Sequence, residues 1–161
     1  MSDTKQKVIL VCGGRNFGEI PRERKVTPEE RLRAKVERYF VYAQLDELAG
    51  CNDDKPLGEY LKIVTGGARG ADRIAIDWAV VNWKDFEEYK ADWNSNPRSA
   101  GILRNIHMLE TAKPDLVVAF PGRNGTAHMV KIAKEAGVEV IEFTTEDVNV
   151  YMEQRNAGMA K

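Results

Sequence analysis

The sequence has few of the residues that build disulfide scaffolds or metal centres. Of its 161 residues, two are cysteine and two are histidine. Cys12 and Cys51 are too few for a disulfide framework, and neither has a partner at metal-ligand spacing. We therefore expect reduced thiols, no metal site and a cytoplasmic location.

Long apolar runs and a basic excess are also missing. No segment approaches the roughly 18 apolar residues of a membrane-spanning helix, and the polar start of the chain does not resemble a signal peptide. Lysine and arginine number 24 against 25 acidic residues, a net charge of -1. This balance argues against membrane or nucleic-acid partners, because a nonspecific nucleic-acid binder carries a strong basic excess.

The residues that are present predict one globular domain. Hydrophobic residues make up 43% of the chain and charged residues 30%, which is ordinary for a protein with a buried core. At roughly 100 to 200 residues per domain, the whole chain, 1–161, fits a single domain. We expect its ordered core to span about 5–155, with a frayed tail over 156–161.

Strand-like and helix-like segments alternate along this domain. Short apolar runs predict strands, and apolar residues at helical spacing predict helices between them. A capping box, Thr27-Pro28-Glu29-Glu30, marks the first helix, and Thr144 or Thr145 can cap the last, which we expect to end near Arg155. The expected strands are 7–12, 60–65, 86–91, 116–120 and 138–143, and the expected helical stripes lie over 32–43, 71–79, 102–109, 129–136 and 145–155, with loops at 15–26 and 50–58.

This alternation, without tight hairpins, predicts an α/β fold. We expect a Rossmann-like three-layer sandwich whose mainly parallel sheet has about five strands in the order 3-2-1-4-5. In such sheets the loops at the carboxyl ends of the strands form the ligand crevice. With this order, the loops after the first, second and fourth strands meet in one place.

Those three loops are rich in glycine and arginine. Glycine lets main-chain N–H groups approach an anion at a helix start, and arginine suits phosphate or carboxylate recognition. Neither G-x-x-x-x-G-K-[ST] nor G-x-G-x-x-G occurs, so a P-loop NTPase or an ordinary dinucleotide dehydrogenase is not supported. The loops are Gly13-Gly14-Arg15-Asn16, Gly66-Gly67-Ala68-Arg69-Gly70-Ala71-Asp72 and Pro121-Gly122-Arg123-Asn124-Gly125-Thr126.

Taken in order, these motifs resemble the cpYpsA-related branch of the SLOG superfamily. The resemblance also includes Ala91-Asp92-Trp93 and Ser99-Ala100-Gly101 with Arg104-Asn105. It implies a Rossmann-like domain that binds a nucleotide or nucleotide derivative. The superfamily includes LONELY GUY phosphoribohydrolases and DNA-processing protein A, its members are often dimers, and this branch is common in phages.

The chain departs from the LONELY GUY motif P-G-G-x-G-T-x-x-E, whose glutamate takes part in cleaving the N-glycosidic bond. Arg123 replaces the second glycine, and Met129 occupies the glutamate position. Arg104 resembles an active-site arginine of the hydrolases. If the chain is an enzyme, Asp72 or Glu19 would have to supply the missing carboxylate, with Arg104 and Asp72 as its catalytic pair.

Several of these residues have a structural interpretation as well. Asp72 and Ser99 can cap helices without touching a ligand, and Asp72 is favoured as a cap over a catalyst. Trp93 can stack on a base or pack at the rim. We expect His128 to face solvent and Cys12 to be a small buried apolar residue, and we expect Tyr39, Phe40, Trp78 and Trp83 to be core or interface residues.

The sequence thus predicts a nucleotide-derivative binding protein, as a sensor, sequestering or ligand-processing protein, with an N-glycosidase acting on a nucleoside phosphate as the alternative. No cofactor is required, and self-association as a homodimer or higher oligomer is expected. If the gene is of phage origin, the location is the host cytoplasm. The expected ligand-binding residues are Gly13, Gly14, Arg15, Asn16, Gly66, Gly67, Ala68, Arg69, Gly70, Asp72, Trp93, Ser99, Arg104, Pro121, Gly122, Arg123, Asn124, Gly125 and Thr126.

Overall fold

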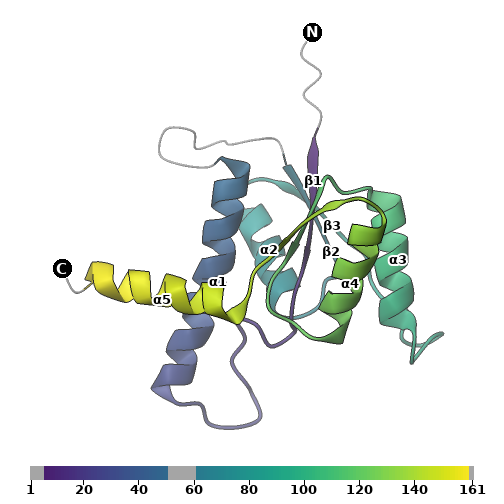
Figure 1. The fold of residues 1–161 in the computed structure, drawn as a ribbon. Coiled ribbons are helices and arrows are strands. Elements are labelled where there is room, and N and C mark those ends of the chain that lie inside the picture. Colours follow the sequence, from purple (N-terminus) through teal and green to yellow (C-terminus); the bar gives the residue numbers. More distant parts are fainter. Residues whose placement is uncertain (1–5, 51–60, 160–161) are drawn as a thin grey trace.

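Five short strands form an all-parallel sheet in the order β3-β2-β1-β4-β5. The computed structural model describes residues 6–50 and 61–159 (Figure 1). The predicted fold class and strand order are confirmed. The strands are β1 (Lys7–Cys12), β2 (Leu61–Thr65), β3 (Asp85–Glu88), β4 (Leu116–Ala119) and β5 (Glu139–Glu142).

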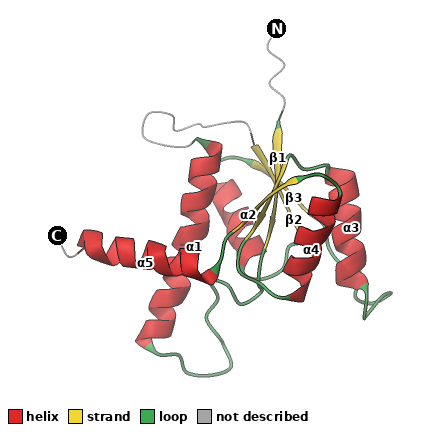
Figure 2. Ribbon diagram, viewed as in Figure 1, coloured by secondary structure: helices red, strands yellow, loops and turns green. Residues whose placement is uncertain are grey.

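Helices cover both faces of the sheet, which gives the three layers seen in Figure 2. Successive strand residues point to opposite faces, so Ile9 and Val11 of β1 belong to one core and Leu10 to the other. The first core packs under α1, α2 and α5, and the second under α3 and α4. The helices are α1 (Pro28–Ala49), α2 (Ala71–Val81), α3 (Ala100–Ala112), α4 (Asn124–Glu135) and α5 (Thr145–Met159).

Some expectations about individual segments were wrong. Residues 156–159, predicted to be a frayed tail, continue α5. Trp83, predicted to be a core or interface residue, is 94% exposed and does not belong to the core, whereas an interface role stays a prediction. The third strand is shorter than predicted, and most of the expected 50–58 loop lies outside the described residues. Within the described ranges, none of the helices is long and apolar enough to cross a membrane.

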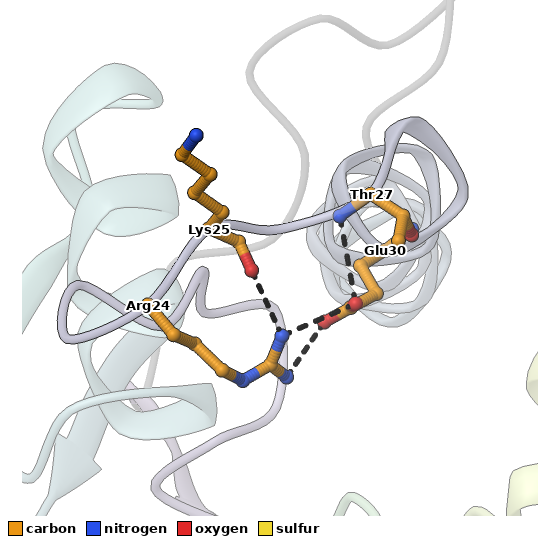
Figure 3. A network of polar contacts seen from close by, with 4 residues as sticks. All are labelled: Arg24, Lys25, Thr27 and Glu30. Carbon is orange, nitrogen blue, oxygen red and sulfur yellow. Dashed lines mark hydrogen bonds and ion pairs between the residues drawn. The ribbon is translucent and has the colours of Figure 1, made fainter.

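The start of α1 carries the capping box predicted from the sequence. Figure 3 shows the Glu30 carboxylate of this box with the Thr27 N–H and Arg24. The Thr27 hydroxyl accepts the Glu30 N–H at 3.1 Å, and the Glu30 carboxylate accepts the Thr27 N–H at 3.5 Å. Arg24 donates to the same carboxylate at 2.7 and 3.2 Å and to the Lys25 carbonyl at 3.1 Å. These contacts fix the direction in which the 15–26 loop enters the helix.

Replacing Thr27 by alanine is expected to lower the free energy of unfolding by about 1 kcal/mol, because the Glu30 N–H loses its acceptor. Urea denaturation measures this change. Thr27→Ser keeps the hydroxyl and serves as the control, with a change of less than about 0.5 kcal/mol. Equal stability of Thr27→Ala and the wild type would contradict a stabilising cap.

Candidate nucleotide-binding cleft

The carboxyl ends of β1, β2 and β4 open into a cleft of about 820 Å³. Most predicted site residues line it, as the strand order required. Four do not: Gly67, Gly70, Ser99 and Pro121. Those that do are Gly13, Gly14, Arg15, Asn16, Gly66, Ala68, Arg69, Asp72, Trp93, Arg104, Gly122, Arg123, Asn124, Gly125 and Thr126.

Backbone contacts between the loops shape this end of the sheet. The Gly14 N–H donates to the Pro121 carbonyl at 2.9 Å, and the Ala71 N–H approaches the Gly14 carbonyl at 3.3 Å. Gly70 has a φ of +84°, and a Cβ there would overlap the Gly14 carbonyl oxygen. The glycine at position 70 therefore serves loop packing, although it does not line the cleft.

Arg104 crosses the floor of the cleft from α3. Its guanidinium donates to the carbonyls of Gly66 at 2.9 Å and Tyr89 at 3.3 Å, and Nε donates to the Asn105 side chain at 3.1 Å. A Cβ at Gly66 would overlap the guanidinium, so this glycine makes room for the arginine. Burial lowers the pKa of Arg104. These contacts hold the guanidinium in one position within the cleft.

Asp72 is a buried carboxylate with one unsatisfied oxygen. Oδ2 accepts the Ala68 N–H at 3.2 Å, whereas Oδ1 has no hydrogen-bond partner among the described residues. Burial raises the pKa of Asp72 to about 7, against the opposing effects of the Ala68 N–H and the Arg104 charge. The start of α2 has no side-chain cap bond, so Asp72 braces the preceding loop instead of capping the helix.

Two polar residues near Arg104 were not among the predicted ligand-binding residues. Asn105 is buried, and its Nδ2 donates to the Gly125 carbonyl and lies 3.2 Å from Nδ1 of His128. Both residues line the cleft. The expectation that His128 faces solvent was wrong, because the contact with α3 half-buries it. The signal in the sequence was the Arg104-Asn105 pair, which belongs to the motifs that carry the family resemblance.

The rim of the cleft combines an aromatic ring with cations. The Arg15 guanidinium lies 5.5 Å from the centre of the Trp93 ring, which is half exposed. Arg98 and Ile102, neither of which was predicted, also line this rim. Ser99 begins α3, but its side chain makes no cap bond.

The other positions considered for a catalytic acid or thiol are Glu19, Met129 and Cys12, and none of them offers a free carboxylate or thiolate to the cleft. Glu19 accepts the Gly70 N–H at 3.1 Å and does not line the cleft. Met129 is fully buried in the core between the sheet, α3 and α4. Cys12, predicted to be buried, lines the cleft and is only partly buried. Desolvation still raises the pKa of its thiol, so the thiol stays protonated and unreactive.

The cleft is basic although the chain is not. Among the described residues, five arginines line it, against two carboxylates, those of Glu37 and Asp72. No cluster of three or more potential metal ligands occurs in residues 6–50 and 61–159. The arginines are Arg15, Arg69, Arg98, Arg104 and Arg123.

A sequence profile of the YspA, cpYpsA-related SLOG family matches residues 7–95. The chain belongs to this family. The matched segment contains β1, α1, β2, α2, β3 and Trp93, and therefore two of the three glycine loops.

Two individual proteins are similar to this chain. The Gene 61 protein of Mycobacterium phage D29 is 44% identical over 105 residues, which cover 61% of this chain and 82% of the phage protein. The X-ray structure of the structural-genomics target TM1055 has a TM-score of 0.55 at 17% identity and covers 84% of this chain and 72% of its own. The second likeness concerns the fold alone.

Proposed function

We propose that this SLOG protein binds a nucleotide or nucleotide-derived phosphate in the cleft, as a sensor, sequestering or ligand-processing protein. The observation that carries the proposal is the gathering of five arginines around one cleft in a chain of net charge -1. Guanidinium groups bind phosphate with charge-assisted, often bidentate hydrogen bonds. The phage relative makes a host cytoplasm the proposed location.

The helix starts at the cleft support an anionic ligand. The starts of α2, α3 and α4 have no side-chain cap bond. Away from the cleft, α1 has a full capping box, and at α5 Thr144 and Asp147 bond each other's N–H at 3.1 and 2.7 Å. Uncapped starts leave N–H groups and the positive end of the helix dipole for a ligand.

The hydrogen bonds already made within the loops favour α4 as the phosphate site. In the loop after β2, the N–H groups of Gly67, Ala68 and Gly70 donate to protein oxygens. At the start of α4, Arg123 occupies the N-cap position without a side-chain cap bond, and Asn124, Gly125 and Thr126 line the cleft. We place the phosphate there.

Two further features of the cleft match the sugar and the base of a nucleotide. Oδ1 of Asp72 needs a hydrogen-bond donor, such as a sugar hydroxyl or a base N–H. The Trp93 ring beside Arg15 offers a stacking surface for a base. One molecule with a phosphate, a sugar and a base could bind the start of α4, Asp72 and Trp93 at the same time.

A second candidate function, N-glycosidase activity, is favoured by Asp72. A carboxyl group whose pKa is about 7, buried in the cleft with a free oxygen, can accept a proton near neutral pH. Met129 cannot take that role from within the core. Release of free base from a nucleoside monophosphate, lost in Asp72→Asn, would support the activity, and inactivity with all substrates would exclude it.

Arg104→Ala is expected to weaken nucleotide binding by about 10- to 100-fold, because it removes a preorganised charged donor. Calorimetry against nucleoside mono-, di- and triphosphates, cyclic nucleotides and ADP-ribose measures the affinity. Arg22→Ala is the control and should bind like the wild type, because Arg22 is exposed and does not line the cleft.

Mass spectrometry of the small molecules released on denaturing the natively purified protein would identify the ligand class. An intact nucleotide derivative in stoichiometric amount indicates binding without turnover, and free base or ribose phosphate indicates hydrolysis. If the folded protein retains nothing and binds no compound of the panel, the proposed function is wrong.

A further inference from the structure

Asn105 is a buried asparagine whose side-chain amide is held in one orientation. Its Oδ1 accepts the Nε–H of Arg104 at 3.1 Å, and a guanidinium can only donate. Its Nδ2 lies 3.2 Å from the Gly125 carbonyl oxygen, which can only accept. An amide turned the other way round would place oxygen against oxygen and N–H against N–H. The oxygen of Asn105 therefore faces Arg104, and its NH2 group faces α4.

This orientation determines which nitrogen of His128 carries the proton. One hydrogen of the Asn105 NH2 group goes to the Gly125 carbonyl, and the other points to Nδ1 of His128 at 3.2 Å. Nδ1 must accept this hydrogen bond, so it carries no hydrogen itself. In a neutral imidazole the hydrogen is then on Nε2. Asn105 thus holds His128 in the Nε2–H tautomer.

The Nε2–H group of His128 is a donor that the protein leaves unused. Among residues 6–50 and 61–159, the contact with Asn105 is the only hydrogen bond that His128 forms. The one buried side-chain polar atom without a partner in those ranges is Oδ1 of Asp72, so Nε2 of His128 is not sealed within the protein. Because His128 lines the cleft, a ligand there can reach this donor.

The imidazole lies beside the first turn of α4. In an α-helix the side chains lean toward the helix N-terminus, so His128 leans toward Asn124 and Gly125, one turn before it. Its contact with Asn105 agrees with this direction, because the same NH2 group also binds the Gly125 carbonyl. Asn124, Gly125 and His128 all line the cleft. The unused donor is therefore next to the proposed phosphate position.

We propose that His128 binds a phosphate oxygen of the ligand through Nε2–H, and that Asn105 is the positioning residue that fixes this donor. The inference rests on the proposed function, because it takes the phosphate to lie at the start of α4. The hydrogen bonds then run in one direction, from the Arg104 cation through Asn105 and His128 to the anion, and each bond polarises the next. A single N–H in a fixed direction selects a ligand that places one phosphate oxygen in line with it.

Calorimetry of His128→Ala and His128→Gln tests the contact, with the nucleoside 5′-monophosphate that the wild type binds most tightly. His128→Ala should weaken binding about tenfold, because a donor to a charged group is lost. His128→Gln keeps an NH2 group near the position of Nε2 and should bind within about threefold of the wild type. His107→Gln is the control and should bind normally, because His107 is exposed and does not line the cleft. Circular dichroism checks that each variant is folded.

Inorganic phosphate, titrated in the same proteins, shows which part of the ligand His128 contacts. His128→Ala should weaken phosphate binding by the same factor as monophosphate binding. A loss with the monophosphate alone would place His128 on the sugar or base, and an equal loss in His128→Ala and His128→Gln would show that the ring and not its N–H makes the contact. Either result, or normal binding by His128→Ala, would overturn the inference and leave the proposed function standing. If the folded wild type binds no nucleotide, both are wrong.

Nitrogen NMR of the full chain reports the tautomer directly. The chain has two histidines, so His107→Gln leaves His128 as the source of all imidazole signals. At pH 8, where histidine is neutral, we expect a bare Nδ1 and a protonated Nε2, and inorganic phosphate should shift the Nε2 signal. Adding Asn105→Asp should bring a proton to Nδ1, because a carboxylate oxygen then faces it. A protonated Nδ1 in His107→Gln, or a bare Nδ1 in the folded Asn105→Asp protein, would show that residue 105 does not set the tautomer and would overturn the inference.

Discussion

Gly70→Ala is expected to lower the free energy of unfolding by about 3 kcal/mol or more. The φ of +84° at this position is costly for any residue with a Cβ, by about 1 to 2 kcal/mol. The added Cβ would also overlap the Gly14 carbonyl oxygen and lie 2.8 Å from the Arg15 carbonyl carbon. Both obstacles are backbone atoms, so a side-chain rotation cannot relieve them, and the loops after β1 and β2 must separate.

Gly125→Ala is the matched control in the loop after β4. A Cβ at this position would have no atom within 4 Å, the φ is not positive, and the residue belongs to the first turn of α4. Alanine should leave stability unchanged or raise it by up to about 1 kcal/mol, since glycine is a poor helix former. Urea denaturation compares the two variants, and similar stabilities would show that the loop packing at Gly70 is unimportant.

The sequence predicted the loops of the cleft because local chemistry determines them. The strand before Gly13-Gly14 and the strand before Gly66-Gly67 are short apolar runs that stop at glycine, and parallel strands bring their carboxyl ends to one edge. The Thr27 capping box is likewise encoded within four residues. These features depend on neighbours in the chain, so pattern reasoning found them.

Apart from Arg104, which the family resemblance indicated, the cleft residues that α3 contributes could not be found in the same way. Their side chains depend on the rotation of the helix over the sheet, and the apolar stripe through Ile102 and Ile106 suggested the opposite rotation. The helix instead buries Asn105, which contacts Gly125 and His128 across the cleft. An apolar stripe predicts burial, but it does not say whether the same chain or another molecule provides it.

Asp72→Asn is expected to raise the free energy of unfolding at pH 8 by up to about 4 kcal/mol. Folding raises the pKa of this carboxyl from 3.8 to about 7 because the group is buried. Between about pH 4 and pH 7 the folded protein therefore holds a proton that the unfolded chain has released. Stability falls as the pH rises through this window and is lowest once the buried group is charged.

Denaturation of both proteins between pH 4 and pH 8 measures this effect. The two should be similarly stable near pH 4, and the advantage of Asp72→Asn should grow up to about pH 7 and then level off. Asp77→Asn is the control, because that carboxylate forms a half-exposed pair with Arg38 at 3.5 Å, and its loss should change stability by less than about 1 kcal/mol at any pH.

The same variant separates a structural from a functional role for Asp72. In Asp72→Asn the side-chain oxygen can still accept the Ala68 N–H. An NH2 group then takes the position of the unsatisfied oxygen. We expect nucleotide affinity at pH 8 to fall about tenfold or more while stability rises, since a ligand donor loses its charged acceptor. A variant that is less stable and binds normally would identify Asp72 as a structural residue only. A gain in stability with a loss of binding would show that the buried charge of Asp72 strengthens ligand binding and lowers the stability of the fold.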